Sequence, residues 1–232
     1  IYMGDWSSDV CSSDLDLDAD VDIVRDRLGY ENGSGWLANR PAAEAILTEA
    51  PEAELIVLGS KVNSKLSAVL LGSVATAVTA KAPCPVVVVR GRSAGGPILV
   101  GTDGSADSEA AMLFGFEEAA RSGSELRVIY CWQSHGHDAA SSDKAQELLL
   151  DWLAESLAPY RDKFPDVRVR AEVVAGRAAV VLTERSAACS LVVVGSRGRG
   201  GVKGLLLGSV SQNLLHHADC PVAVVRTPKG ES

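Results

Sequence analysis

The chain has 232 residues, 47% hydrophobic and 22% charged, which is typical of a globular protein with one or two domains. Its formal net charge of -8 and its scattered basic residues argue against a nucleic-acid partner. Five cysteines without a CxxC pair favour reduced thiols, and no apolar run approaches the roughly 20 residues of a membrane-spanning helix. Since no secretory leader pattern opens the sequence either, we expect a soluble, cytoplasmic protein that does not bind membranes.

The first fifteen residues have no apolar periodicity, so they predict neither a helix face nor a strand face. Residues 5–15 read DWSSDVCSSDL and resemble the translated product of a sequencing-library adaptor. An ordinary disordered tail is the alternative. Under either interpretation we leave residues 1–15 out of the fold, and under the adaptor interpretation we expect the natural sequence to enter near Asp16.

Two stretches of the chain repeat each other. Leu55–Arg90 aligns without gaps to Leu191–Arg226 at an offset of 136 residues, with 16 identities in 36 positions. A repeat on this scale predicts two copies of one domain. We therefore divide the chain into a first copy, residues 16–91, and a second copy, residues 96–227, joined by a short linker containing Gly, Ser and Arg.

The first copy carries only part of the pattern. We expect a strand at 21–24, a loop excursion at 28–39, a helix at 41–50 and a strand at 55–58. Nothing in this copy corresponds to the first two strands of the second copy. The first copy is therefore predicted to be incomplete.

The second copy alternates β-rich apolar runs with longer helical patterns, which predicts βαβ units around a parallel sheet. The expected strands are residues 97–102, 125–132, 167–174, 191–194 and 222–226, and the expected helices are residues 108–121, 141–164, 177–188 and 209–217. We place a helix cap at Ser209 and end that helix before the Asp-Cys-Pro break. The fold class is therefore α/β, with tandem doubly wound parallel five-stranded sheets and an incomplete first copy.

A glycine pattern follows the fourth strand of the second copy. Gly195 and Gly198 are followed after nine residues by Gly208 and Ser209, between a buried strand and a helix N-terminus. Ligands of open α/β sheets bind at the carboxyl ends of strands, and bare amides at a helix start favour an anion. We expect the glycines to let the backbone approach a phosphate, although a flexible turn is the alternative. Basic side chains over the same loop would add positive charge: Arg197, Arg199 and Lys203.

This arrangement, G-x2-G-x9-G-[ST], resembles the ATP-binding pattern of the universal stress protein family, and the stretches LLLGSVS and HADCPVAVVR are similar to that family as well. The resemblance covers residues 96–226 fully and residues 21–90 in part. It implies an adenine nucleotide alpha hydrolase-like fold that binds ATP, with or without Mg²⁺. It also implies nucleotide contacts at Gly101, Thr102, Asp103, Cys131, Val194, Gly195, Arg197, Gly198, Gly208, Ser209, Val210 and Ser211.

Several of these positions carry alternatives or departures. The resemblance places Asp103 against the nucleoside, where a carboxylate can accept hydrogen bonds from ribose hydroxyls, but a structural Asp capping the turn is the alternative. Cys131 corresponds to a position that packs on adenine, although core packing explains it nearly as well. In the first copy Val62 replaces the second glycine and Ala75 replaces Ser211, so we expect no ATP site there.

Other polar features are assigned to structure rather than chemistry. His135 and His137 lack a spaced third metal ligand, and the pair His216–His217 ends a helix whose dipole it complements. Ser105 lacks a partnered His and Asp, so we expect a turn or cap role. We therefore expect no metal site, no catalytic residue and at most slow ATP hydrolysis.

The leading hypothesis is a stress-response switch or adaptor that binds ATP in its second copy. A nucleotide-free interaction or dimerisation module of the same fold is the competing hypothesis, and a metabolic enzyme would need a second substrate pocket that the sequence does not indicate. Residues 222–226 form the natural edge for pairing with residues 86–90. This predicts an intrachain pseudo-dimer or a homodimer through strand five.

Overall fold

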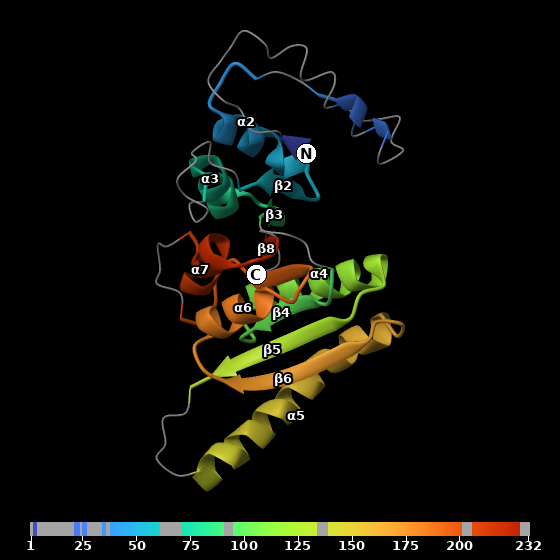
Figure 1. The fold of residues 1–232 in the computed structure, drawn as a ribbon, viewed down its shortest axis with the longest axis vertical. Coiled ribbons are helices and arrows are strands. Elements are labelled where there is room, and N and C mark those ends of the chain that lie inside the picture. Colours follow the sequence, from blue (N-terminus) through green and yellow to red (C-terminus); the bar gives the residue numbers. More distant parts are fainter. Residues whose placement is uncertain are drawn as a thin grey trace.

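The chain forms one eight-stranded sheet with helices on both faces (Figure 1). The strand order is β1-β2-β3-β8-β7-β4-β5-β6, in which the last five strands belong to the second copy. The computed structural model describes residues 2–3, 21–23, 25–26, 34–35, 38–60, 71–90, 95–133, 139–200 and 206–227.

Short, valine-rich strands alternate with helices along the chain, because β-branched side chains suit a pleated and buried surface. The strands are β1 (Tyr2–Met3), β2 (Ile56–Gly59), β3 (Val86–Val89), β4 (Ile98–Thr102), β5 (Leu126–Trp132), β6 (Val169–Ala175), β7 (Leu191–Gly195) and β8 (Val222–Val225). The helices are α2 (Ala42–Glu49), α3 (Ser73–Lys81), α4 (Ala106–Ser122), α5 (Ala139–Lys163), α6 (Ala178–Ser186) and α7 (Ser209–His217), with a 3-10 turn at Ala50–Glu52.

The second copy is a parallel sheet covered on both faces, as the sequence predicts. Helices α4 and α5 pack on one face around Phe116 and Leu153, and α6 and α7 pack on the other around Leu182 and Leu214. Helix α4 begins at Ser105, whose hydroxyl accepts a hydrogen bond from the Ser108 amide. The cap role predicted for Ser105 is therefore confirmed.

The two copies are joined through their last strands, β3 and β8, and we call this pairing the joint. The strands run antiparallel, with Val87 opposite Ala223 and Val86 opposite Val224. Residues 87 and 223 are equivalent in the repeat, so a pseudo-two-fold axis passes between them. The intrachain pairing predicted from the duplication is present, and it merges the two expected parallel sheets into one mixed sheet.

One hydrophobic cluster runs along a single face of the merged sheet and is shared by both copies. It includes Ile46 and Val78 from the first copy and Leu182 and Leu214 from the second. Burying side chains of both copies in one cluster removes apolar surface from water on each side of the joint. The copies are therefore held together by side-chain packing as well as by the strand pairing.

Two expectations for the first copy are wrong. Residues 21–23 are helical rather than extended, and an ion pair of 3.4 Å between Asp22 and Arg25 has the three-residue spacing of a helix. In addition, β1 pairs in parallel with β2 at the strand-one position, where the sequence predicts no strand. The adaptor-like segment 5–15 and most of the loop excursion 28–39 lie outside the described residues.

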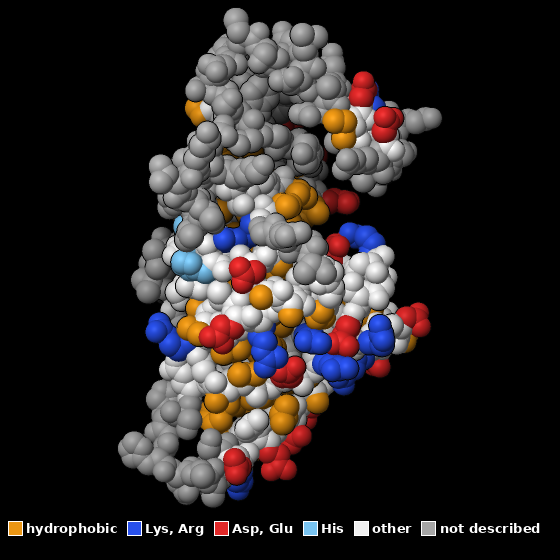
Figure 2. Space-filling view, viewed as in Figure 1, with side chains coloured by type: hydrophobic (Ala, Val, Ile, Leu, Met, Phe, Trp, Pro, Cys, Tyr) orange, Lys and Arg blue, Asp and Glu red, His pale blue; other side chains and the backbone are white. Residues whose placement is uncertain are grey.

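The surface carries both signs of charge. Figure 2 shows Lys and Arg side chains interspersed with Asp and Glu over the visible face of the second copy, with no field of a single sign. None of the helices in the described ranges has the length and apolar character needed to cross a membrane.

Candidate functional site

A cavity of about 290 Å³ lies at the carboxyl ends of β4, β5 and β7. This volume is close to the lower end of the range of small-molecule sites, about 300–1,000 Å³. The structure brings to this one cavity every residue for which the sequence predicts a nucleotide contact: Gly101, Thr102, Asp103, Cys131, Val194, Gly195, Arg197, Gly198, Gly208, Ser209, Val210 and Ser211.

One wall of the cavity is formed by the glycine loop, of which the structure describes residues 195–200 and 206–208, and by the first turn of α7; we call this wall the cradle. The residue that caps α7 is Gly208, with φ of -77° and ψ of 160°, and Ser209 is the first helical residue. The predicted helix start at Ser209 is therefore confirmed, while the capping position belongs to Gly208. The amide of Gln212 donates to the carbonyl of Gly208 and closes the first turn. The amides of Ser209, Val210 and Ser211 precede that bond, which is the arrangement that binds anions at helix starts.

The glycines of the loop are packed against protein atoms. A Cβ on Gly195 would lie 2.8 Å from the carbonyl carbon of Asp107, and a Cβ on Gly198 would overlap Oδ2 of Asp103. The sequence predicts these glycines for the approach of a phosphate. The structure gives a second reason, because the loop lies directly on the start of α4 and on the turn after β4.

Asp103 ties the turn after β4 to the glycine loop. Its Oδ1 accepts hydrogen bonds from the amide and the hydroxyl of Ser105, at 3.0 and 2.6 Å, and its Oδ2 accepts one from the Arg199 amide at 2.8 Å. Burial opposes ionisation, but these hydrogen bonds outweigh it and lower the pKa of the carboxyl below its ordinary value. The structural role weighed for Asp103 is thus present, while the residue also lines the cavity.

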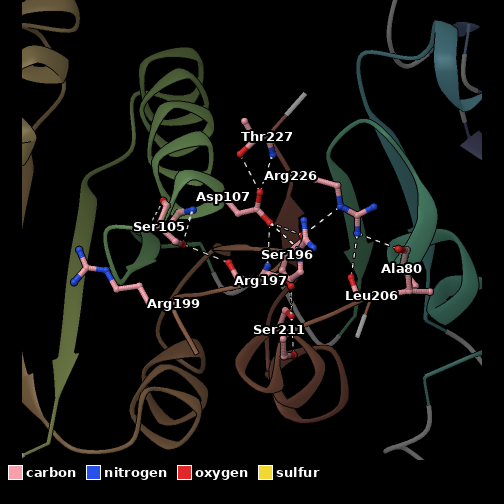
Figure 3. Close-up of polar contacts among 12 residues, drawn as sticks. Ala80, Ser105, Asp107, Ser196, Arg197, Arg199, Leu206, Ser211, Arg226 and Thr227 are labelled. Atoms are coloured by element: carbon pink, nitrogen blue, oxygen red, sulfur yellow. Dashed lines mark hydrogen bonds and ion pairs between the residues drawn. The ribbon is translucent and has the colours of Figure 1, made fainter. Parts of the chain in front are cut away.

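Asp107 supports the loop from the first turn of α4, and sequence reasoning missed it. The residue is 8% exposed. Oδ2 accepts from the Ser196 hydroxyl at 2.6 Å and from the Arg197 amide at 3.1 Å, and Oδ1 accepts from the amide and hydroxyl of Thr227 (Figure 3). Burial disfavours the charge, yet these donors lower the pKa of Asp107. Its sequence signal, an acidic residue in a helix's first turn, is too common to mark a site.

Ser196 connects the glycine loop to three other elements and is 1% exposed. Its carbonyl accepts from the Gly208 amide at 2.8 Å and from the Ser211 hydroxyl at 3.1 Å. Its hydroxyl donates to Asp107 and accepts from Nε of Arg226 at 3.2 Å (Figure 3). These bonds fix the loop between β7 and α7 without any ligand.

The arginines of the loop leave it in different directions. Nε of Arg197 lies 3.9 Å from Oδ2 of Asp107, and the Arg197 side chain is 56% exposed. Arg199 extends toward α5, away from α7 (Figure 3), and its guanidinium carbon lies 5.9 Å from the centre of the Trp152 ring. The aromatic ring attracts the cation, so Arg199 does not lie over the cradle as the sequence predicts. Lys203 lies outside the described residues.

Another part of the cavity lining is apolar. Ile129 and Leu182 are 1% and 2% exposed, and they line the cavity with Ala178 and Cys131. Burial raises the pKa of the Cys131 thiol to about 11 against the opposing effect of Arg185, so the thiol is neutral near pH 7. Sequence reasoning found Cys131 but missed its three neighbours, whose residue types look like ordinary core.

Among the described residues, His216 and His217 do not line the cavity. His216 and His217 end α7 as expected, and residues 134–138, with His135 and His137, lie outside the described ranges. Among the residues that the structure describes, no group of three or more His, Cys, Asp or Glu side chains is placed to hold a metal ion.

Sequence comparison places this geometry among known proteins. The chain matches the family model described as the Universal stress protein family over residues 36–90 and 96–226. A universal stress protein of Mycobacterium tuberculosis is 43% identical over 187 residues, which cover 75% of this chain and 62% of that protein. A universal stress protein of Mycolicibacterium smegmatis is 36% identical over 215 residues, which cover 88% of this chain and 73% of that protein. The chain thus spans less than two thirds of the M. tuberculosis relative.

Solved structures share the architecture across both copies. A universal stress protein from Archaeoglobus fulgidus matches with a TM-score of 0.61 and 20% identity, over 94% of this chain and 78% of that chain. A functionally unknown protein from Pseudomonas aeruginosa matches with a TM-score of 0.61 and 19% identity, over 91% of this chain and 78% of that chain. At these identities the likeness supports the fold alone.

Proposed function

The chain belongs to the universal stress protein family, and on this premise we propose that its second copy binds ATP and that the protein acts as a stress-response switch or adaptor. The observation that carries the proposal is the composition of one cavity. Its lining combines apolar side chains, a turn of helix amides and the residue Asp103, which follows β4. A nucleotide needs this combination, because its base is flat and weakly polar and its phosphates are anionic.

Each part of ATP has a matching part of the cavity. The amides of Ser209, Val210 and Ser211 receive the phosphates, with the Ser209 hydroxyl as a further donor. Asp103 offers its carboxylate to the ribose hydroxyls. Ile129, Leu182, Ala178 and Cys131 line the apolar part of the cavity, which receives the adenine. Mg²⁺, where it takes part, accompanies the phosphates and is bound chiefly through their oxygens.

Fast hydrolysis is not part of the proposal. A general base works best when its pKa lies near the operating pH. The pKa values of Asp103 and Asp107 are both lowered, since hydrogen bonds to the ionised forms overcome the cost of burial. Both carboxylates are also engaged by donors of the protein. A tightly held nucleotide with slow turnover suits a switch better than an ATPase.

Equilibrium binding of ATP to the full chain, with and without Mg²⁺, tests the proposal. We expect one ATP per chain, and binding weaker by about tenfold or more in Gly198→Val, because roughly 1–3 kcal/mol of strain displaces the loop from Asp103. Gly208→Val should also bind poorly, since its side chain enters the cradle. The matched control is Gly72→Val in the first copy, where a Cβ meets no atom of the described residues within 4 Å.

Circular dichroism on each variant verifies that the fold is retained. The proposal fails if the folded parent chain does not bind ATP, an outcome that favours the nucleotide-free interaction module. It also fails if Gly198→Val and Gly208→Val bind ATP as tightly as Gly72→Val does.

A further inference from the structure

Each copy ends its last strand with an arginine that crosses the joint. Arg226, after β8, donates to the carbonyls of Ala80 and Ala82 at the end of α3, at 3.0 and 3.1 Å. Arg90, after β3, donates to the carbonyl of His216 at the end of α7, at 2.8 Å. A cation at a helix C-terminus pairs with carbonyls that the helix leaves without partners. The two arginines therefore make equivalent contacts across the pseudo-two-fold axis.

The two arginines differ in the hydrogen bonding of their Nε atoms. Nε of Arg226 donates to the hydroxyl of Ser196 at 3.2 Å. Nε of Arg90 is buried and has no hydrogen-bond partner in the part of the chain that the structure describes. The residue equivalent to Ser196 in the first copy is also a serine, Ser60, so the difference does not come from residue type at that position.

Arg226 holds the glycine loop at both of its ends. Besides Ser196, it donates to the carbonyl of Leu206 at 3.3 Å, two residues before the helix cap Gly208 (Figure 3). Through Ser196 it is connected to Asp107 and to the first turn of α7. One guanidinium is thus bonded at the same time to the wall of the cavity in the second copy and to the end of α3 in the first.

We propose that Arg226 couples nucleotide binding in the second copy to the docking of the first copy. The inference rests on the proposed ATP site and adds the means of its regulation. The guanidinium is a rigid planar fork, so its donors reach Ser196 and Leu206 in this geometry only while α3 supplies the remaining acceptors. Arg226 is a positioning residue, because it acts on the nucleotide through the loop and does not line the cavity.

Coupling of this kind is reciprocal. If docking of the first copy strengthens ATP binding by some factor, ATP strengthens that docking by the same factor. Binding of ATP must therefore protect α3 against opening, although α3 contributes no residue to the cavity. A purely local role of Arg226 in shaping the loop would not produce this protection.

The first measurement is the affinity of the full chain for ATP. Arg226→Lys keeps a positive charge near Asp107 but cannot bridge the loop and α3, and we expect affinity to fall about fivefold or more. Arg90→Lys is the matched control, since it alters the same kind of cross-joint contact without touching the glycine loop. We expect this control to change affinity by less than about twofold.

The second measurement is amide hydrogen exchange in α3, with and without saturating ATP. In the parent chain ATP should slow exchange in α3. In Ser196→Ala, which removes the bond of Arg226 to Ser196 but keeps its contacts with Leu206 and α3, ATP should slow that exchange less than in the parent. ATP binding without protection of α3 in the parent, or equal loss of affinity in both arginine variants, overturns the coupling and leaves the ATP site standing. Absence of ATP binding in the parent overturns both proposals.

Discussion

The fourth strands of the two copies end in the same dipeptide, Gly-Ser, but the glycines have different surroundings. A Cβ on Gly59 would meet no atom of the described residues within 4 Å, while one on Gly195 would lie against the backbone of α4. At the ends of the fifth strands the copies behave alike, because Arg90 and Arg226 both cross the joint. Residues common to both copies therefore make contacts across the joint in both copies, whereas they help to form the cavity in the second copy.

The reason for the difference is the helix beneath the loop. In the second copy α4 supplies Asp107 and the backbone on which Gly195 rests. Within the described ranges, no helix of the first copy occupies the position of α4. A glycine there is free of close contacts, and its replacement should be tolerated.

The largest effect is therefore expected from Gly195→Ala. The added methyl group meets backbone atoms of α4, which cannot turn aside as a side chain can, so the variant should lose about 3 kcal/mol of unfolding free energy. Thermal unfolding followed by circular dichroism would show this as a fall in Tm of roughly 6–12 °C. Gly59→Ala is the matched control and should leave Tm nearly unchanged. Equal shifts in the two variants would contradict the contrast between the copies.

A smaller effect is expected from Asp107→Asn, which removes the charge that four donors stabilise. The cost should be about 1.5–3 kcal/mol near pH 7. Because the folded pKa of Asp107 is lowered, its stabilisation is present above the ordinary Asp pKa of about 3.9 and is lost as the pH falls through the folded value. Denaturant unfolding between pH 7 and pH 3 should therefore show a shallower acid loss in the variant.

The control for this measurement is Asp151→Asn on the exposed side of α5. It should follow the parent chain across the same pH range. An acid dependence of Asp107→Asn as steep as that of the parent would show that Asp107 does not carry the charge-dependent support of the loop.

The smallest effect is expected from Arg199→Ala. This change removes the cation over the Trp152 ring, a contact of about 0.5–1 kcal/mol at an exposed site. Tryptophan emission should change because the ring loses a charged neighbour, and unfolding free energy should fall only slightly. Arg121→Ala on α4, whose partner is Glu118, is the control and should leave emission unaltered. Identical spectra for the two variants would mean that Arg199 does not rest on Trp152 in solution.

The pattern of apolar residues along the chain was sufficient to predict the helices and strands of the second copy. The bounds of α7 are those predicted, 209–217, and the strands agree within two residues at either end. Strong apolar periodicity over a whole element explains this success. Residues 21–23 failed because a short apolar run fits a helix as well as a strand, and its conformation depends on which neighbours are present.

Some residues of the site were predicted from the sequence and others were missed, and the reason differs from that for the helices and strands. The glycine pattern and the family resemblance together found the lining residues that lie in recognisable motifs, but they missed the apolar residues Ile129, Ala178 and Leu182. Asp107 and Arg226 lie close to Ser196 only after β7, β8 and α4 are brought together. Their roles depend on strand order and on the antiparallel joint, which merged two predicted sheets into one. The spacing of residues along the chain does not predict such contacts.

The pseudo-two-fold axis between Val87 and Ala223 has a consequence for assembly. A self-complementary edge can be satisfied within one chain or by exchange between two chains, which is the geometry of domain swapping. Residues 90–97 alone separate β3 from β4, so the linker keeps the two edges at high effective concentration. Shortening that linker until it no longer spans the joint would prevent pairing within one chain and favour exchanged dimers.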